Sequence, residues 1–257
     1  IEYFNLSEKD TRIGNAKRKR SVATIEQIAK TLEGMPCSTS IEMRDRALIA
    51  FVILTGARDG AVASAKIKHI DLADHSFYQD ARDVNTKFSK TFTTYFFPVG
   101  ELPHKILADW IDYLVTELGY KQNSPLFPKT KLAHDANQQF EAVGLLEEHW
   151  SNANPIRKIF AQAFALAGLP YFNPHSFRNT LVRLGEKLCQ TPEEFKAWSQ
   201  NLGHESVLTS FYSYGDVPDY KQAELLRKLS MPAQNTSHDM EEQFKQFMQF
   251  QQMKGNI

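Results

Sequence analysis

From residue 202 the chain reads LGHESVLTSFYSYG, so that His204 stands a few residues ahead of two tyrosines, Tyr212 and Tyr214. The segment just upstream, PHSFRNTLVRLGEKL from residue 174, places His175 and Arg178 one helical turn apart. Arginine and histidine can bind a phosphate group, and an activated tyrosine can attack one. Taken singly, each short motif is more typical of a surface or packing role.

Two segments nearer the start of the chain carry basic residues that suit the same chemistry. The sequence Leu54-Thr55-Gly56-Ala57-Arg58 puts an arginine directly after a predicted helix that ends at glycine. A strand-like region further along contains Lys87 and Lys90 near a polar turn. Each of these segments alone is also typical of a solvated surface, so the set is informative only as an ordered group.

Hydrophobic periodicity predicts a mostly helical domain with one small antiparallel sheet near its first third. The predicted helices cover residues 24–32, 40–55, 102–118, 155–167, 174–188, 192–202 and 219–229, and the predicted strands cover 67–72, 76–79 and 91–99. Thr24 is predicted to cap the first helix, and Gly56 is predicted to end the second.

Composition is that of a globular protein, with 42% hydrophobic and 23% charged residues in 257. No apolar run reaches the length of a membrane span and no signal peptide opens the chain, so we expect no membrane partner. Cys37 and Cys189 lie far apart without a CxxC motif, which predicts neither a disulfide framework nor a metal site. A reducing cytoplasm fits this cysteine usage.

Charge is balanced overall, with 30 basic and 30 acidic residues, whereas a dedicated DNA-binding domain is often basic. Basic residues are nevertheless concentrated in one run of four, Lys17, Arg18, Lys19 and Arg20. Residues 1–20 are polar without helical periodicity and are predicted to be an interdomain linker or arm. The basic run is therefore a candidate DNA-binding segment, with a solvated linker cluster as the alternative.

In order and spacing, these segments resemble the tyrosine recombinase, or phage integrase, family over about residues 21–230. Its three boxes read like Thr-Gly-x-Arg, His-x-x-Arg and Leu-Gly-His. The resemblance implies the fold of the family's DNA breaking-rejoining catalytic domain over residues 21–235, mainly α with a small three-stranded antiparallel sheet. It also implies that the N-terminal core-binding domain is absent from this chain, and that residues 236–257 form a tail helix.

The resemblance also assigns chemical roles at a phosphodiester. Arg58 and Arg178 are expected to grip the non-bridging oxygens, which gain charge in the transition state. His204 is expected to donate a hydrogen bond to the phosphate, and His175 to act as an acid–base group near the nucleophile. Because the bond energy is kept in a phosphotyrosine, the family needs no cofactor, neither ATP nor metal.

The tyrosine nucleophile has two candidates. The family's usual spacing after Leu-Gly-His would put it at Ser213, which lies between Tyr212 and Tyr214. Tyr214 is the predicted nucleophile because members with a similar Ser-Tyr-Gly ending use that tyrosine. Tyr212 fits the Thr-x-x-Tyr pattern and is the alternative.

The match is looser around the other supporting residues. The family's hairpin lysine protonates the departing 5′-hydroxyl and often stands eight residues before a proline, as Lys90 does before Pro98; Lys87 is the alternative. Many members carry an acidic residue three positions after the first arginine, where this chain has Ala61. The histidine that usually follows the second arginine is Asn179 here.

The resemblance implies a site-specific recombinase that integrates or excises a mobile element in bacteria, acting on nucleoid DNA. The expected partners are a double-stranded recombination site and three further copies of the chain in a synaptic tetramer. A type IB topoisomerase-like activity and a catalytically silent DNA-binding module are the alternatives. An apolar stripe in the tail, Met240, Phe244, Phe247 and Met248, is predicted to dock either on a neighbouring protomer or on its own domain.

Overall fold

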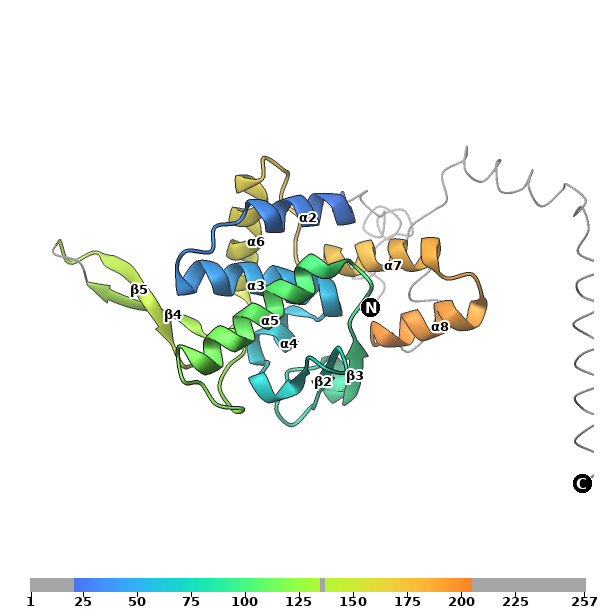
Figure 1. Cartoon of the computed structure of the whole chain (residues 1–257), viewed down its shortest axis with the longest axis horizontal. Coiled ribbons are helices and arrows are strands. Elements are labelled where there is room, and N and C mark those ends of the chain that lie inside the picture. Colours follow the sequence, from blue (N-terminus) through green and yellow to red (C-terminus); the bar gives the residue numbers. More distant parts are fainter. Residues whose placement is uncertain (1–20, 135–136, 205–257) are drawn as a thin grey trace, which may run out of the picture. The chain divides into compact units, whose positions relative to one another are not determined.

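The computed structural model describes residues 21–134 and 137–204 (Figure 1). In these residues the helices are α2 (Ile25–Gly34), α3 (Ser40–Thr55), α4 (Asp59–Ser64), α5 (Glu101–Thr116), α6 (Asn154–Leu166), α7 (Ser176–Leu188) and α8 (Pro192–Asn201). Two short 3-10 helices are η2 (Ile67–His69) and η3 (Lys87–Ser89). The strands are β1 (Ile70–Asp71), β2 (Ser76–Gln79), β3 (Phe92–Tyr95), β4 (Lys129–His134) and β5 (Phe140–Leu146).

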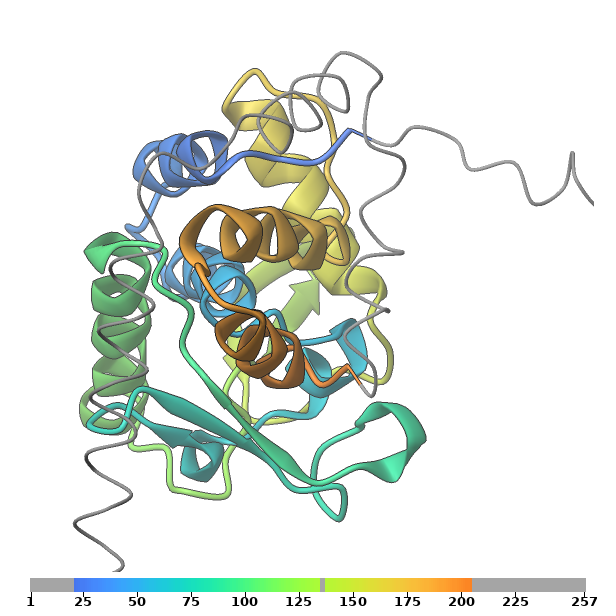
Figure 2. The same cartoon turned by 90° about the vertical axis from the view of Figure 1, so that its right-hand side faces the viewer.

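Helix α3 is the centre of the core. Its second half is an unbroken apolar run from Ala47 to Leu54, and every residue of that run is almost completely inaccessible to solvent. Helices α2, α5, α6 and α7 all contact α3, which Figures 1 and 2 show lying among them. A helix that is apolar all round is buried on every side. The end of α3 therefore has a fixed position inside the domain.

Strands β1, β2 and β3 form an antiparallel sheet in that order, with Phe77 opposite Thr94. The sheet is joined to the end of α8 through Asn201. The Asn201 side chain accepts a hydrogen bond from the Tyr95 backbone nitrogen at 2.7 Å and donates one to the Tyr95 carbonyl at 2.8 Å. This clamp fixes the last turn of α8 against β3.

The structure confirms the predicted mixture of helices and a small three-stranded sheet. Thr24 caps α2 through a capping box with Gln27, as its sequence position predicts. The predicted strand over residues 67–72 begins instead as η2, and the strand predicted over 91–99 is shorter, at Phe92–Tyr95. The predicted helix over residues 219–229 and the tail helix lie outside the described residues.

The sequence does not predict two elements, the short helix α4 and the separate two-stranded hairpin of β4 and β5. Side chains along the outer part of this hairpin are exposed on both faces, as the consecutive strand residues Phe140 and Glu141 show. Strand prediction depends on an alternation between a buried face and a solvated one, which such an arm lacks. In the part of the chain that the structure describes, no helix is long and apolar enough to cross a membrane.

Candidate active site

The turn that ends α3 is the point where distant segments of the chain meet. Gly56 has left-handed backbone angles, φ 59° and ψ 23°, which glycine adopts without a steric cost. A Cβ atom on Gly56 would lie 2.8 Å from Leu202 Cδ2 and 3.0 Å from Leu181 Cδ1. Glycine is therefore required here for its conformation and for the close approach of α7 and the end of α8.

Arg178 projects from the first turn of α7 into this junction and is only 4% exposed. Its Nη1 donates to the Gly56 carbonyl and its Nη2 donates to the Leu202 carbonyl, each at 2.6 Å. The guanidinium thus joins the three predicted boxes directly. Of its five N–H groups, these bonds and a contact with His204 occupy three; counting only residues 21–134 and 137–204, Nε and one N–H of Nη1 remain for a ligand.

His204 lies beside Arg178, with its Nε2 2.8 Å from Arg178 Nη2. Because an arginine can only donate, Nε2 must accept, and the ring proton then sits on Nδ1. Burial, followed by the charges of Arg178, Arg58 and His175, lowers the pKa of His204 to about 4. The ring is therefore neutral at neutral pH and can donate a hydrogen bond from Nδ1.

Arg58 occupies the residue position just before α4, without a capping hydrogen bond from its side chain, and that side chain is partly buried. Burial lowers the pKa of Arg58. Burial, and after it the positive charge of Arg58, lowers the pKa of Arg178 to about 9. Both guanidiniums stay protonated at pH 7. Arg58 lines a cavity of about 300 Å³. Within residues 21–134 and 137–204, no carboxylate or other acceptor pairs with its guanidinium.

His175 immediately precedes α7 and is exposed, one turn before Arg178. Its charge acts on His204, so the histidine of the second box lies near the histidine of the third. The four predicted residues of the three boxes, Arg58, His175, Arg178 and His204, are thus brought together from three segments, the first more than a hundred residues before the other two.

The two lysine candidates both lie in the loop between β2 and β3. Lys87 lines the same cavity as Arg58, and its Nζ lies 4.7 Å from the ring centre of Phe88. Lys90 follows η3, is half-buried, and is not among the residues that line this cavity. Between them Phe88 and Ser89 both have positive φ angles, 61° and 51°. Two successive left-handed non-glycine residues are strained, and such strain is common at functional sites.

The remaining predicted site residues lie outside the described residues. These are the nucleophile candidates Tyr212 and Tyr214, and the basic run Lys17, Arg18, Lys19 and Arg20. The two departures from the family pattern lie close to the site residues in the chain: Ala61 is buried in α4, and Asn179 follows Arg178 in α7.

The chemistry of the assembled groups is that of an anion site. Two guanidiniums and two histidines act on one another, and within the described part of the chain no carboxylate is among the groups that perturb the pKa of Arg178 or His204. Buried positive charge without a counter-ion is costly, and a bound anion relieves that cost. Among the described residues, no group of three or more His, Cys, Asp or Glu side chains could hold a metal ion.

The sequence matches the model of the phage integrase family over residues 20–217. No curated protein matches the chain.

Solved structures of similar fold include the XerA recombinase, with a TM-score of 0.56 and 18% identity over 85% of this chain and 66% of that one. A lambda integrase dimer bound to a COC′ core site has a TM-score of 0.53 and 18% identity, covering 82% of this chain and 65% of that one. The XerH recombinase in a post-cleavage complex with palindromic difH substrate has a TM-score of 0.56 and 17% identity, covering 82% and 53%. The chain thus spans about half to two thirds of the length of these proteins, and it shares their catalytic fold.

Proposed function

The chain belongs to the phage integrase family, and from this we propose that it is a site-specific DNA recombinase that cuts and rejoins DNA through a 3′-phosphotyrosine. One observation carries the proposal. Arg58 faces a cavity without an acceptor among the described residues, and Arg178 and a neutral His204 lie beside it. Such a group suits a phosphodiester whose non-bridging oxygens gain charge as it is attacked.

In the proposed first step, the hydroxyl oxygen of Tyr214 attacks the phosphorus of the scissile phosphodiester. The Oη–P bond forms as the bond from phosphorus to the 5′ oxygen breaks, which leaves a 3′-phosphotyrosine. The tyrosine proton passes to His175, and Lys90 gives a proton to the departing 5′ oxygen. Tyr212 and Lys87 are the alternatives for the nucleophile and the acid.

Arg58 and Arg178 would hold the non-bridging oxygens throughout, with the Nδ1 proton of His204 as a further donor. Arg178 is well suited to this role because its bonds to Gly56 and Leu202 already fix its plane. A preorganised donor needs little rearrangement when the phosphate becomes more negative. In the second step the 5′-hydroxyl of a partner strand attacks the phosphotyrosine and releases the tyrosine, so no ATP or metal is consumed.

The proposed substrate is a double-stranded recombination site, bound largely through phosphate contacts. Solved proteins of this fold bound to such sites, lambda integrase on a core site and XerH on difH, support this choice. We further propose a homotetramer on two synapsed sites, with residues 236–257 docking between protomers and Lys17–Arg20 following the DNA backbone. The proposed setting is integration or excision of a mobile element in the bacterial cytoplasm, at the nucleoid.

A covalent trapping experiment tests the proposal. Nicked suicide duplexes, tiled across the DNA that flanks the gene of this protein, lose the short 5′-hydroxyl strand on cleavage and so trap the intermediate. We expect a protein–DNA adduct that survives denaturation with wild type and with Tyr212→Phe, but not with Tyr214→Phe. The opposite pattern for the two tyrosines would reassign the nucleophile, and no adduct from wild type anywhere in the pool would contradict the proposed function.

Recombination and simple relaxation are separated by a second assay. A recombinase exchanges strands between two duplexes that carry the site, whereas a topoisomerase-like enzyme only relaxes a supercoiled circle. We expect strand exchange with mixed labelled duplexes; adduct formation and relaxation without exchange would favour the topoisomerase-like alternative.

A further inference from the structure

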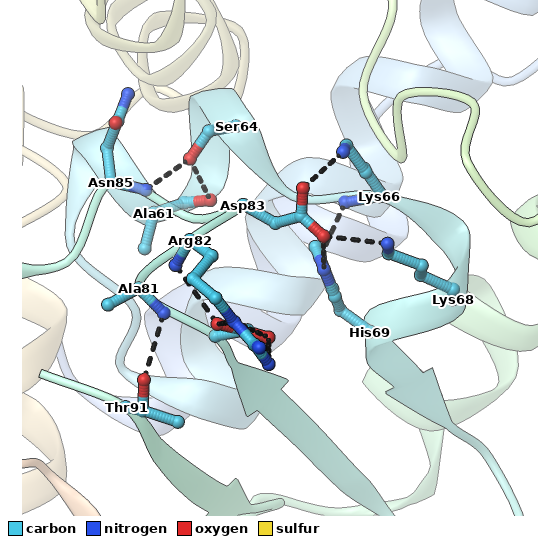
Figure 3. Close-up of polar contacts among 11 residues, drawn as sticks. Ala61, Ser64, Lys66, Lys68, His69, Ala81, Arg82, Asp83, Asn85 and Thr91 are labelled. Carbon is cyan, nitrogen blue, oxygen red and sulfur yellow. Dashed lines mark hydrogen bonds and ion pairs between the residues drawn. The ribbon is translucent and has the colours of Figure 1, made fainter.

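The loop between β2 and β3, residues 80–91, carries both lysine candidates and is tied at its base to the segment that follows Arg58. Figure 3 shows the ties, which reach from the loop to α4 and η2. Within the loop, the Val84 backbone nitrogen donates to the Asp80 carbonyl at 2.7 Å, and the Val84 side chain is buried. The Ala81 nitrogen donates to Thr91 Oγ1 at 3.1 Å and so closes the loop across its neck.

Asp83 makes the first tie. Its Oδ1 accepts from Lys66 Nζ at 2.6 Å and its Oδ2 accepts from Lys68 Nζ at 2.7 Å, with His69 Nε2 3.6 Å away. The lysine hydrogen bonds hold the pKa of the Asp83 carboxyl well below its ordinary value. One carboxylate thus bridges two ammonium groups from the segment around η2. Without the carboxylate, the two ammonium groups would repel each other, and the loop would lose its ion pairs to that segment.

Ser64 makes the second tie. Its Oγ accepts a hydrogen bond from the Asn85 backbone nitrogen of the loop at 2.8 Å, and it donates one to the Gly60 carbonyl within α4 at 2.8 Å. A Cβ atom on Gly60 would lie 3.1 Å from the Asn85 carbonyl oxygen. The loop backbone therefore packs directly on α4, two residues after Arg58.

Beyond Asn85 the character of the loop changes. Residues Lys87, Phe88 and Ser89 are exposed, and the left-handed angles of Phe88 and Ser89 store strain in the tip. The base is thus held to α4 and η2 by ion pairs and hydrogen bonds, whereas Lys87 lies in the exposed tip and Lys90 lies between the tip and the neck at Thr91.

We propose that Asp83, assisted by Ser64, is a positioning residue that holds the lysine-bearing loop at a fixed distance from Arg58, so that the lysine reaches the departing 5′ oxygen. This inference rests on the proposed recombinase function. Asp83 itself touches no phosphate in this role. It acts through the loop, by keeping the proton donor in register with the arginine that holds the scissile phosphate.

The test exploits the leaving group. A 5′-bridging phosphorothiolate replaces the departing oxygen by sulfur, which leaves without a proton donor. The substrate is the DNA site found in the covalent trapping experiment, cleaved by the full chain under single-turnover conditions. We expect Asp83→Asn to cleave the phosphodiester about 10- to 100-fold more slowly than wild type, because misplacement of a catalytic group lowers the rate by this order. On the phosphorothiolate we expect its rate to fall within about threefold of wild type, because no general acid is needed.

Ser64→Ala should show the same selective rescue without any change of charge. Two controls should leave both rates unchanged. Arg82→Gln alters the same loop by removing the hydrogen-bonded ion pair with Asp80 inside it while leaving both ties of Asp83 to Lys66 and Lys68, and Asp74→Asn removes a carboxylate from the exposed β1–β2 turn. Asp83→Glu, which keeps the carboxylate, should recover part of the phosphodiester rate.

Equal slowing of Asp83→Asn on both substrates, or no slowing on either, overturns the positioning role. Each variant is first compared with wild type by urea unfolding, and if Asp83→Asn is unfolded, Ser64→Ala decides the question through the same outcomes. Failure of wild type to cleave either substrate contradicts the recombinase function instead, so the two proposals fail in different ways.

Discussion

His204 should make the stability of the protein depend on pH in a range where most carboxylates do not titrate. In the unfolded chain its pKa takes the ordinary value of 6.5, whereas burial and the neighbouring cations lower it to about 4 in the fold. The unfolded state therefore binds a proton first as the pH falls. Stability is complete above pH 6.5 and is lost progressively as the pH falls toward 4.

The size of the effect follows from these two pKa values. Lowering the pH from 7 to 5 costs the folded state about 2 kcal/mol if the whole difference in pKa applies. Because the ring is only partly buried, solvent screening reduces this to about 1 kcal/mol. Burial also lowers the pKa of His69, His104 and His149, so the total loss in wild type is larger, but those residues are unchanged in a His204 variant.

The assay is urea unfolding of wild type and His204→Asn at pH 7 and at pH 5. We expect wild type to lose about 1 kcal/mol more than the variant between the two pH values. His134→Asn, which alters an exposed histidine on the β4–β5 hairpin, should lose as much as wild type. Equal losses in wild type and His204→Asn would refute the reasoning, because His204 would then not lie buried among cations.

Three further predictions concern the junction and the loop. Arg178→Lys keeps the charge but loses the two Nη groups that donate to the Gly56 and Leu202 carbonyls. Urea unfolding should therefore show a free energy of unfolding lower by roughly 2–4 kcal/mol. A variant as stable as wild type would count against these bonds. Gly56→Ala should lower the free energy of unfolding by about 1–3 kcal/mol, because residue 56 has a positive φ and the added carbon would contact Leu202. The control Gly34→Ala, with no atom within 4 Å of the added carbon, should cause no measurable loss in thermal unfolding. Equal effects of the two substitutions would contradict the account of the turn. Lys90→Ala should cleave a phosphorothiolate substrate much faster than a phosphodiester in single-turnover reactions. If the phosphorothiolate rescues Lys87→Ala and not Lys90→Ala, the general acid is Lys87, the lysine that lines the cavity with Arg58.

Much of the helical framework can be predicted because local signals and tertiary packing agree. The apolar run Ala47–Leu54 belongs to a 16-residue segment that is too long for a typical strand and is followed by a glycine at position 56, and it forms the buried half of α3. The capping box at Thr24 is a local pattern that the sequence shows directly. Helix α4 has only six residues and no apolar period, so nothing in its sequence separates it from a loop.

The residues of the three boxes can be predicted, but the contacts that hold them cannot. The motif around His175 and Arg178 carries no sign that Arg178 bonds to the carbonyls of Gly56 and Leu202. Those partners are set by the tertiary approach of α3, α7 and α8. The tie of Asp83 to Lys66 and Lys68 is equally hidden, since the partners lie on different elements and follow no helical or strand period.

In the proposed reaction, a tyrosine of this chain bonds covalently to the 3′ end of cut DNA. Digestion of the trapped adduct with protease and nuclease, followed by mass spectrometry, identifies the residue that carries the nucleotide. We expect a 3′-phosphonucleotide on Tyr214, and none after substitution of Arg58 or Arg178 by alanine. A nucleotide on a residue other than Tyr214 or Tyr212, or no modified peptide at all, would contradict the account.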